Sequence, residues 1–375
     1  MELMAGIGES TSCLIQPESI INKNNPKDRH FAVILPLIND TMGDLRDELR
    51  EKIFKCSEED FETLAMSIFR YQYKHNRTYQ KYCQTLFRSD VLIPKSLLEI
   101  PYLPVSFYKS HDIRCGNWNP EQIFQSSSTG GIPSKHAVRD IQIYRESFLK
   151  CFQLNYGDID QFAIIGLLPS YLEREGSSLI TMVSELIKQS MDGDSGFYLY
   201  NHHELTALLL KRESQKRKTI LFGVTFALLD FAESFELHLP NTVIIETGGM
   251  KGRGKEPTRE EVHSKLNAKL GIKEIHSEYG MTEMLSQAYM IKHDKFSCPF
   301  WLRPIVREQR DPMCLQEWGR GMLNFIDLAN LDTCSFIATD DIGHVFTNKE
   351  FAVFGRADNT EVRGCNLMVA DFFQT

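Results

Sequence analysis

A run of small hydroxyl and glycine residues is the first part of the sequence that could do chemistry. It reads SSSTGGIPSK over 126–135. Glycines let backbone N–H groups approach phosphate oxygens, and Lys135 adds positive charge. The glycine and lysine spacing differs from that of a Walker A loop. The run suits a loop that cradles phosphates, but composition alone favours an exposed turn of small residues.

A second run, SEYGMTE at 277–283, combines an aromatic ring, a hydroxyl and a carboxylate. Tyr279 could stack on a nucleobase, Thr282 could meet a phosphate, and Glu283 could hold Mg²⁺. The alternative is a turn between a strand and a helix, with Thr282 as the N-cap.

Asp341 and Arg356 lie in two further polar segments, TDDIG and GRAD. A carboxylate can hold the two hydroxyls of a ribose, and arginine suits phosphate or ribose oxygens. The alternatives are an Asp-Gly turn and a surface ion pair.

Cys365 follows an arginine and a glycine, in RGCNL. An exposed thiolate is a good nucleophile toward an activated carboxyl group. The chain has nine cysteines, and none is in C-x-x-C spacing. This pattern indicates neither a zinc ribbon nor a redox pair, so a buried, reduced thiol is the alternative for each cysteine.

The elements that must position these residues alternate along the middle of the chain. Strands separated by helices imply right-handed crossovers and a mostly parallel sheet, with ligands beyond the carboxyl ends of the strands. The polar loops after 125, 246 and 277 fall at predicted strand ends. The predicted strands span 162–168, 219–224, 242–245 and 272–276.

The flanking regions have other patterns. Apolar residues at helical spacing predict helix over 43–89, and short β-like runs separated by turn residues follow 300. We therefore expect a poorly structured N-terminal extension at 1–41, an α/β core at 42–300, and a small β-rich subdomain at 301–375 that completes the nucleotide site.

Composition limits the classes of function. The 375 residues carry a formal net charge of −8, which argues against a basic nucleic-acid-binding coat. The basic run at 211–218 is expected to be a solvated helix end. The longest apolar stretch, 220–229, is too short to span a membrane, and the N-terminus lacks a signal-peptide pattern. We expect a cytoplasmic protein without a membrane span or a nucleic-acid partner.

The order of the motifs resembles that of adenylate-forming enzymes. Within them, the chain is most similar to the acyl-protein synthetases, which charge fatty acids onto protein thiols; YGMTE is the most specific match, and ETGGMKGRG at 246–254 also fits. The resemblance implies an adenylate-forming N-terminal core without the C-terminal lid domain. It implies ATP and Mg²⁺ as cofactors, with Glu283 as the metal ligand, and Cys365 and Thr282 as catalytic residues. The ATP-binding residues that it implies are Ser127, Ser128, Thr129, Gly130, Gly131, Lys135, Gly248, Gly249, Tyr279, Gly280, Thr282, Asp341 and Arg356.

The implied reaction makes acyl-AMP from a fatty acid and then an acyl thioester on Cys365, from which a reductase or a carrier protein would take the acyl group. Ser128 and Asp340 stand where the family usually has glycine, and Lys135 is one place later than the family's lysine. Two alternatives stay open: an acyl-CoA or aryl-CoA ligase, and a non-catalytic partner subunit that binds a nucleotide or acyl-AMP. Candidates for an apolar acyl channel, which would serve equally as core, are Leu167, Leu168, Leu172 and Leu179.

Overall fold

The computed structural model describes six stretches of the chain: 42–87, 94–126, 131–168, 176–248, 257–292 and 294–357. Its contacts divide the chain into two units, Met1–Leu45 and Arg46–Thr375. Of the first unit only 42–45, the start of a helix, are described, and the fold below is that of the second. The predicted extension at 1–41 lies outside the described residues. So do Ser127, Ser128, Thr129, Gly130, Leu172, Gly249 and Cys365.

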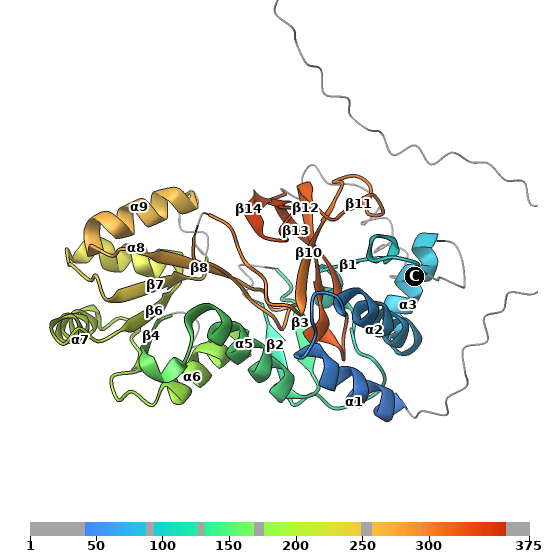
Figure 1. The fold of residues 1–375 in the computed structure, drawn as a ribbon, viewed down its shortest axis with the longest axis horizontal. Helices are drawn as coiled ribbons and strands as arrows, with labels where there is room; N and C mark the ends of the chain where they lie inside the picture. The colour runs from blue at the N-terminus through green and yellow to red at the C-terminus, as the bar shows by residue number, and fades with distance from the viewer. Residues whose placement is uncertain are drawn as a thin grey trace, which may run out of the picture. The chain divides into compact units, whose positions relative to one another are not determined.

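The α/β part is built on a six-stranded sheet in the order β5-β4-β6-β7-β8-β9, parallel except where β9 joins β8. Helices cover it on both sides, with α5 and α6 opposite α8 and α9 (Figure 1). The strands are β4 (Ala163–Leu167), β5 (Gly196–Phe197), β6 (Thr219–Gly223), β7 (Thr242–Glu246), β8 (Ile275–Tyr279) and β9 (Ala288–Met290). The helices are α5 (Ile141–Tyr156), α6 (Ser178–Ser190), α7 (His202–Ser214), α8 (Thr225–Ser234) and α9 (Arg259–Leu270).

Helix α9 begins and ends as its sequence predicts. Thr258 and Glu261 form a complete capping box, each side chain accepting a hydrogen bond from the other's backbone N–H. Gly271 ends the helix at a φ of 57°, the left-handed conformation that glycine adopts without strain.

The strand after α9 starts later than predicted, at Ile275 rather than Ile272. The side-chain amide of Asn267 donates to the Ile272 carbonyl at 2.6 Å, so this residue still belongs to the turn that ends the helix. Strand β8 also ends later than predicted, at Tyr279, so the first three residues of the SEYGMTE run belong to the strand.

The predicted helical region at 43–89 contains three helices, α1 (Met42–Ile53), α2 (Phe61–His75) and α3 (Arg77–Phe87). Asn76 separates α2 from α3. Its side-chain oxygen accepts from the backbone N–H of Tyr79 at 2.9 Å, which caps α3, and its amide donates to the Thr333 carbonyl at 3.0 Å.

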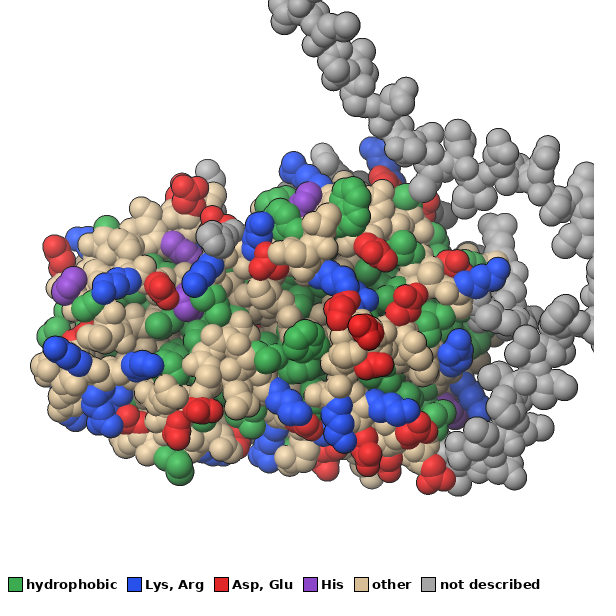
Figure 2. Space-filling model, viewed as in Figure 1, with side chains coloured by type: hydrophobic (Ala, Val, Ile, Leu, Met, Phe, Trp, Pro, Cys, Tyr) green, Lys and Arg blue, Asp and Glu red, His purple; other side chains and the backbone are tan. Residues whose placement is uncertain are grey.

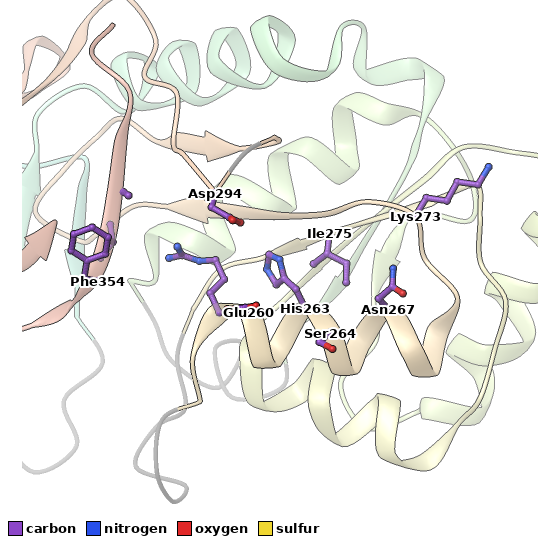
Figure 3. A pocket seen from close by; sticks show the side chains of 11 residues that line it. Glu260, His263, Ser264, Asn267, Lys273, Ile275, Asp294 and Phe354 are labelled. Carbon is purple, nitrogen blue, oxygen red and sulfur yellow. The ribbon is translucent and has the colours of Figure 1, made fainter. Parts of the chain in front are cut away.

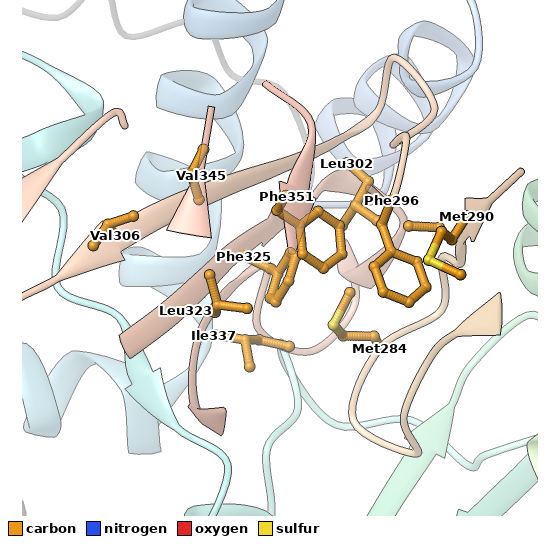
Figure 4. Close-up of a cluster of buried hydrophobic side chains, with 11 residues drawn as sticks. Met284, Met290, Phe296, Leu302, Val306, Leu323, Phe325, Ile337, Val345 and Phe351 are labelled. Atoms are coloured by element: carbon orange, nitrogen blue, oxygen red, sulfur yellow. The ribbon is translucent and has the colours of Figure 1, made fainter. Parts of the chain in front are cut away.

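The β-like runs after 300 form most of a second sheet, in the order β1-β13-β12-β10-β11 with β14 beside β13. Its core cluster includes Phe296, Phe325 and Phe351, and residues that follow β8 complete it (Figure 4). The strands are β1 (Leu103–Pro104), β10 (Leu302–Arg307), β11 (Leu315–Gln316), β12 (Gly319–Asp327), β13 (Phe336–Val345) and β14 (Phe351–Arg356). The short remaining elements are the hairpin β2 (Gln122–Gln125) and β3 (Lys135–Val138), helix α4 (Phe107–Ser110), and three 3-10 turns, η2 (Leu97–Glu99), η3 (Ile159–Gln161) and η4 (Leu328–Asn330).

The predicted fold class is confirmed: the structure is α/β, with a largely parallel sheet flanked by helices and a β-rich part toward the C-terminus. Because β1 joins the second sheet, that sheet also uses a segment from before residue 300. The boundary at 300 stays a prediction. Within the described ranges, no helix is both long and apolar enough to cross a membrane.

The basic run at 211–218 is only partly solvated. Lys211 is exposed, but the Arg212 side chain is 2% exposed and pairs with Asp192 at 3.1 Å and Asp194 at 2.9 Å. The prediction of a solvated helix end is therefore wrong for Arg212, because two acidic residues in the loop after α6 pair with its buried guanidinium. On the face shown in Figure 2, basic and acidic side chains are interspersed.

Candidate functional site

Three of the predicted site residues meet where β8, β13 and β14 come together. The Tyr279 hydroxyl donates to Asp341 Oδ2 at 2.7 Å, and Arg356 Nε donates to Asp341 Oδ1 at 3.0 Å. The Tyr279 ring lies 5.2 Å from the Phe325 ring and 5.2 Å from the Phe351 ring, between centroids. The aromatic core therefore fixes the ring whose hydroxyl contacts the carboxylate.

Asp341 affects the titration of both of its partners. The charge of its carboxylate raises the pKa of Arg356, while burial and the same charge hold the pKa of Tyr279 well above its usual range. The Asp341 side chain is 7% exposed and that of Arg356 is 77% exposed. A carboxylate offers about four acceptor positions, so after these two hydrogen bonds Asp341 can still accept from a diol.

The segment after β8 is a turn. Gly280 is exposed, Thr282 is half-buried, and no described helix begins at Thr282, so the alternative of a helix N-cap is wrong. The Thr282 carbonyl lies 2.8 Å from His136 Nδ1 on β3. Glu283 is buried at 8% exposure, and burial raises the pKa of its carboxyl against an opposing hydrogen bond from Ser134.

The loop between β2 and β3 is closed at its base. The Ser126 backbone N–H donates to the Ser134 carbonyl at 3.1 Å, and the Ser134 N–H donates to Ser126 Oγ at 2.9 Å. Lys135, the first residue of β3, is exposed, whereas its neighbours Ser134 and His136 are buried; Gly131 is exposed. The hairpin thus brings Ser134, rather than Lys135, to Glu283.

Two carboxyl groups that the sequence reasoning gave no role lie at the carboxyl ends of β7 and β8. Glu246 Oε1 accepts from the Thr225 hydroxyl and, at 2.8 Å, from the backbone N–H of Gly248, which has a φ of 72°. Its Oε2 accepts from the Ser277 hydroxyl at 3.3 Å. Burial, and then the charge of Glu246, raise the pKa of Glu278 to about 8. The signal available in the sequence was an acidic residue at the end of each predicted strand.

A pocket of about 540 Å³ lies beside this group, between α9 and β14 (Figure 3). His263 on its wall lies 3.3 Å from the Ser277 hydroxyl, so the pocket and the carboxyl ends of the strands share a polar contact. Arg259 lies 4.9 Å from the centre of the Phe296 ring, and Asp294 and Phe354 also line the pocket.

Glu283 fits the chemistry of a magnesium ligand. Its carboxyl is buried and beside a hydroxyl, and Arg356 and Lys109 lower its pKa only as the smallest influences. Burial disfavours the negative charge of the carboxylate, and a divalent cation would offset that cost. Mg²⁺ is commonly bound through one or two carboxylates plus phosphate oxygens. In the described part of the chain, no group of three or more His, Cys, Asp or Glu side chains is arranged to hold a metal without such a ligand.

Leu167 and Leu168 are fully buried and Leu179 is half-buried, as either an acyl channel or plain core requires. The described cysteines are free and mostly buried, and His202 and His203 pack against Phe231 and Phe235.

The fold is that of the adenylate-forming enzymes. The chain is similar to a 2-hydroxyisobutyryl-CoA ligase solved with 2-HIB-AMP and CoA, with a TM-score of 0.59 and 13% identity over 82% of this chain and 71% of that one. It is also similar to the N-terminal domain of FACL13 from Mycobacterium tuberculosis, with a TM-score of 0.44 and 16% identity over 66% of this chain. The chain spans about 63% of the length of that domain.

The family itself is defined by sequence. The model of the family "Acyl-protein synthetase, LuxE" matches residues 44–374, and the chain belongs to this family. A curated relative, the long-chain-fatty-acid–luciferin-component ligase of Vibrio harveyi, is 21% identical over 337 residues, which cover 83% of this chain and 87% of the relative.

Proposed function

We propose that the protein uses ATP to activate a fatty acid as acyl-AMP and then transfers the acyl group to a cysteine thiol as a thioester. Membership of the acyl-protein synthetase family supports this function, as does the name of the Vibrio harveyi relative. The observation that carries the proposal is the convergence of Tyr279, Asp341 and Arg356 beside the turn that holds Thr282 and Glu283.

In the first step, a carboxylate oxygen of the fatty acid attacks the α-phosphorus of ATP and pyrophosphate leaves. Asp341 would accept the ribose hydroxyls, and Tyr279 would flank the adenine. The Thr282 hydroxyl would donate to an α-phosphate oxygen as negative charge builds there. Glu283 would hold Mg²⁺, which supplies positive charge to the phosphates when it is bound.

In the second step, a thiolate sulfur attacks the acyl carbonyl carbon, the bond from that carbon to the AMP oxygen breaks, and AMP leaves. AMP is a far better leaving group than the oxide of a free carboxylate, which is why activation comes first. We assign the thiol to Cys365; its proton passes to solvent as the thiolate forms. The thioester would hold the acyl group until a reductase or a carrier protein accepts it.

The aspartate at position 340, where the family usually has glycine, is compatible with this function. The Asp340 side chain is exposed on β13, while its backbone carbonyl accepts from the Ala357 N–H at 2.9 Å. An outward side chain leaves the adjacent Asp341 free to face Tyr279.

The test combines intact-protein mass with pyrophosphate release. The protein is incubated with ATP, Mg²⁺ and fatty acids of different lengths, with and without coenzyme A. We expect pyrophosphate release and an acyl adduct that Cys365→Ala abolishes. Cys314→Ala, which removes a partly exposed cysteine of the described residues, is the control and should keep the adduct.

Other results would redirect the proposal. Pyrophosphate release without an adduct would exclude Cys365 as the acceptor but retain the ligase, and acyl-CoA formation would identify coenzyme A as the acceptor. Nucleotide binding without pyrophosphate release would refute the catalytic function and favour a binding subunit.

A further inference from the structure

The chain at the start of β3 holds two consecutive residues of the turn after β8, Thr282 and Glu283. His136 Nδ1 lies 2.8 Å from the Thr282 carbonyl oxygen, and the Ser134 side chain hydrogen-bonds the Glu283 carboxyl. His136 on β3 and Ser134, just before the strand, are both 1% exposed. The hairpin that carries the predicted phosphate loop is therefore linked directly to the turn that carries the proposed phosphate and magnesium ligands.

The hydrogen bonds of His136 define its tautomer. A carbonyl oxygen can only accept, so Nδ1 must carry the proton that it donates to Thr282. Nε2 then has a free lone pair that faces the Thr333 hydroxyl at 3.0 Å, and the single proton of this hydroxyl is shared with the Asn330 carbonyl at 3.3 Å. Burial lowers the pKa of His136 to about 4, so the ring is neutral near pH 7 and suits this one-donor, one-acceptor arrangement.

The other side of the turn is held by Asn330, in η4, and by Asp327, the residue before η4. Asn330 donates through Nδ2 to the Glu283 carbonyl at 2.8 Å and accepts through Oδ1 from the Leu285 N–H at 3.0 Å. Asp327 Oδ2 accepts from the N–H groups of Leu285 and Ser286 at 2.9 and 3.0 Å. These contacts fix the backbone after Glu283, so the contact from His136 acts on the peptide before it.

We propose that His136 is a positioning residue for the activation step: its hydrogen bond to the Thr282 carbonyl orients Thr282 and Glu283 relative to strand β3. The physical reason is the planarity of the peptide bond. The Thr282 oxygen lies in one plane with the Cα atoms of Thr282 and Glu283. Fixing that oxygen therefore orients the attachment points of both side chains together. The proposal rests on the proposed function.

The test compares His136→Asn with His136→Gln. The shorter asparagine amide can donate from near the position of Nδ1 and so can keep the Thr282 contact. The longer glutamine amide reaches the position of Nε2 and so keeps only the Thr333 side. Both replacements are neutral amides in the same buried site, so each is the control for the other.

We expect His136→Asn to retain kcat for fatty-acid-dependent pyrophosphate exchange within about threefold, whereas His136→Gln should lower kcat by roughly 10- to 100-fold, as loss of a group that orients a ligating residue typically does. His136→Gln should also need more Mg²⁺ for half-maximal rate, at a similar thermal midpoint. The ratio between the variants should be constant from pH 6 to 9, because the ring that they replace is neutral there. Equal losses in both variants, or losses that only follow the thermal midpoints, would overturn the proposal.

A second pair of variants applies if the first pair does not fold. Thr333→Val removes the hydroxyl that faces His136 Nε2 and so releases one side of the ring, and Thr333→Ser retains a hydroxyl. A lower kcat in the valine variant alone would support the proposal, and equal rates would refute it.

Failure of the proposed function gives a different result. If the wild-type protein shows no pyrophosphate exchange with any of the fatty acids, the ligase function fails. Calorimetric binding of Mg·ATP then decides the role of His136. Binding that is several-fold weaker in His136→Gln than in His136→Asn supports positioning, and equal affinity overturns it.

Discussion

Replacing Glu278 with glutamine should change how the stability of the protein depends on pH. The Glu278 side chain is mostly buried at the end of β8, and burial together with the charge of Glu246 raises its pKa from 4.5 to about 8. The folded protein therefore keeps a proton on Glu278 at a pH at which the unfolded chain releases it. Glutamine has nearly the same shape and does not titrate.

The sign and size of the effect follow from this shift. Because the pKa is raised in the folded state, the stabilising contribution is complete below about pH 4.5 and is lost as the pH rises through about 8. The loss is about 1.4 kcal/mol per pH unit. Between pH 5.5 and 7.5, the wild-type protein should lose about 2.7 kcal/mol relative to Glu278→Gln. Groups that titrate equally in both proteins cancel in this difference.

Urea unfolding of both proteins at pH 5.5, 6.5 and 7.5 measures the difference in the free energy of unfolding. A difference that stays constant over this range would refute the raised pKa of Glu278. In a Glu246→Gln background, the pH-dependent range should shrink from its upper end, because one cause of the shift is removed.

Three further changes test other contacts by urea unfolding at fixed pH. Thr258→Ala removes the capping box of α9 and should cost about 1 kcal/mol; Thr258→Ser should cost much less, and equal losses would contradict the cap. Arg212→Ala removes a buried guanidinium from between Asp192 and Asp194, which keep Arg217 and Lys211 as their remaining cations, and should cost about 1.5–3 kcal/mol; Arg212→Lys should recover part of the loss. Tyr279→Phe removes the hydrogen bond to Asp341 and should cost about 1.5–3 kcal/mol. If Tyr279→Phe costs as much in an Asp341→Asn background as in the wild-type protein, the bond contributes nothing.

The sequence predicted the strands and helices of the α/β sheet well because local signals agreed there. The capping box at Thr258 and the glycine at 271 fix both ends of α9. The start of β8 could not be predicted, because it depends on a hydrogen bond between the Asn267 side chain and a backbone carbonyl. The break at Asn76 likewise depends on Thr333, which is distant in sequence.

The candidate site was predictable in its residue types but not in its connections. Motif order indicated Tyr279, Asp341 and Arg356, and the structure brings them into direct contact. The roles of Glu246 and His136 could not be predicted, because neither role follows from residue type alone. Each is distinguished by partners from other elements, which composition and spacing do not reveal.

Strand β8 separates two sets of polar contacts by the alternation of its side chains. Ser277 and Tyr279 reach Glu246 and Asp341, while His276 contacts Tyr156 on α5. Inserting or deleting one residue in the strand would exchange the two sets, since each side chain would move to the opposite face. Over evolutionary time, this segment should therefore tolerate substitutions more readily than changes in length. An alignment of relatives should contain no gaps between the start of β8 and Glu283.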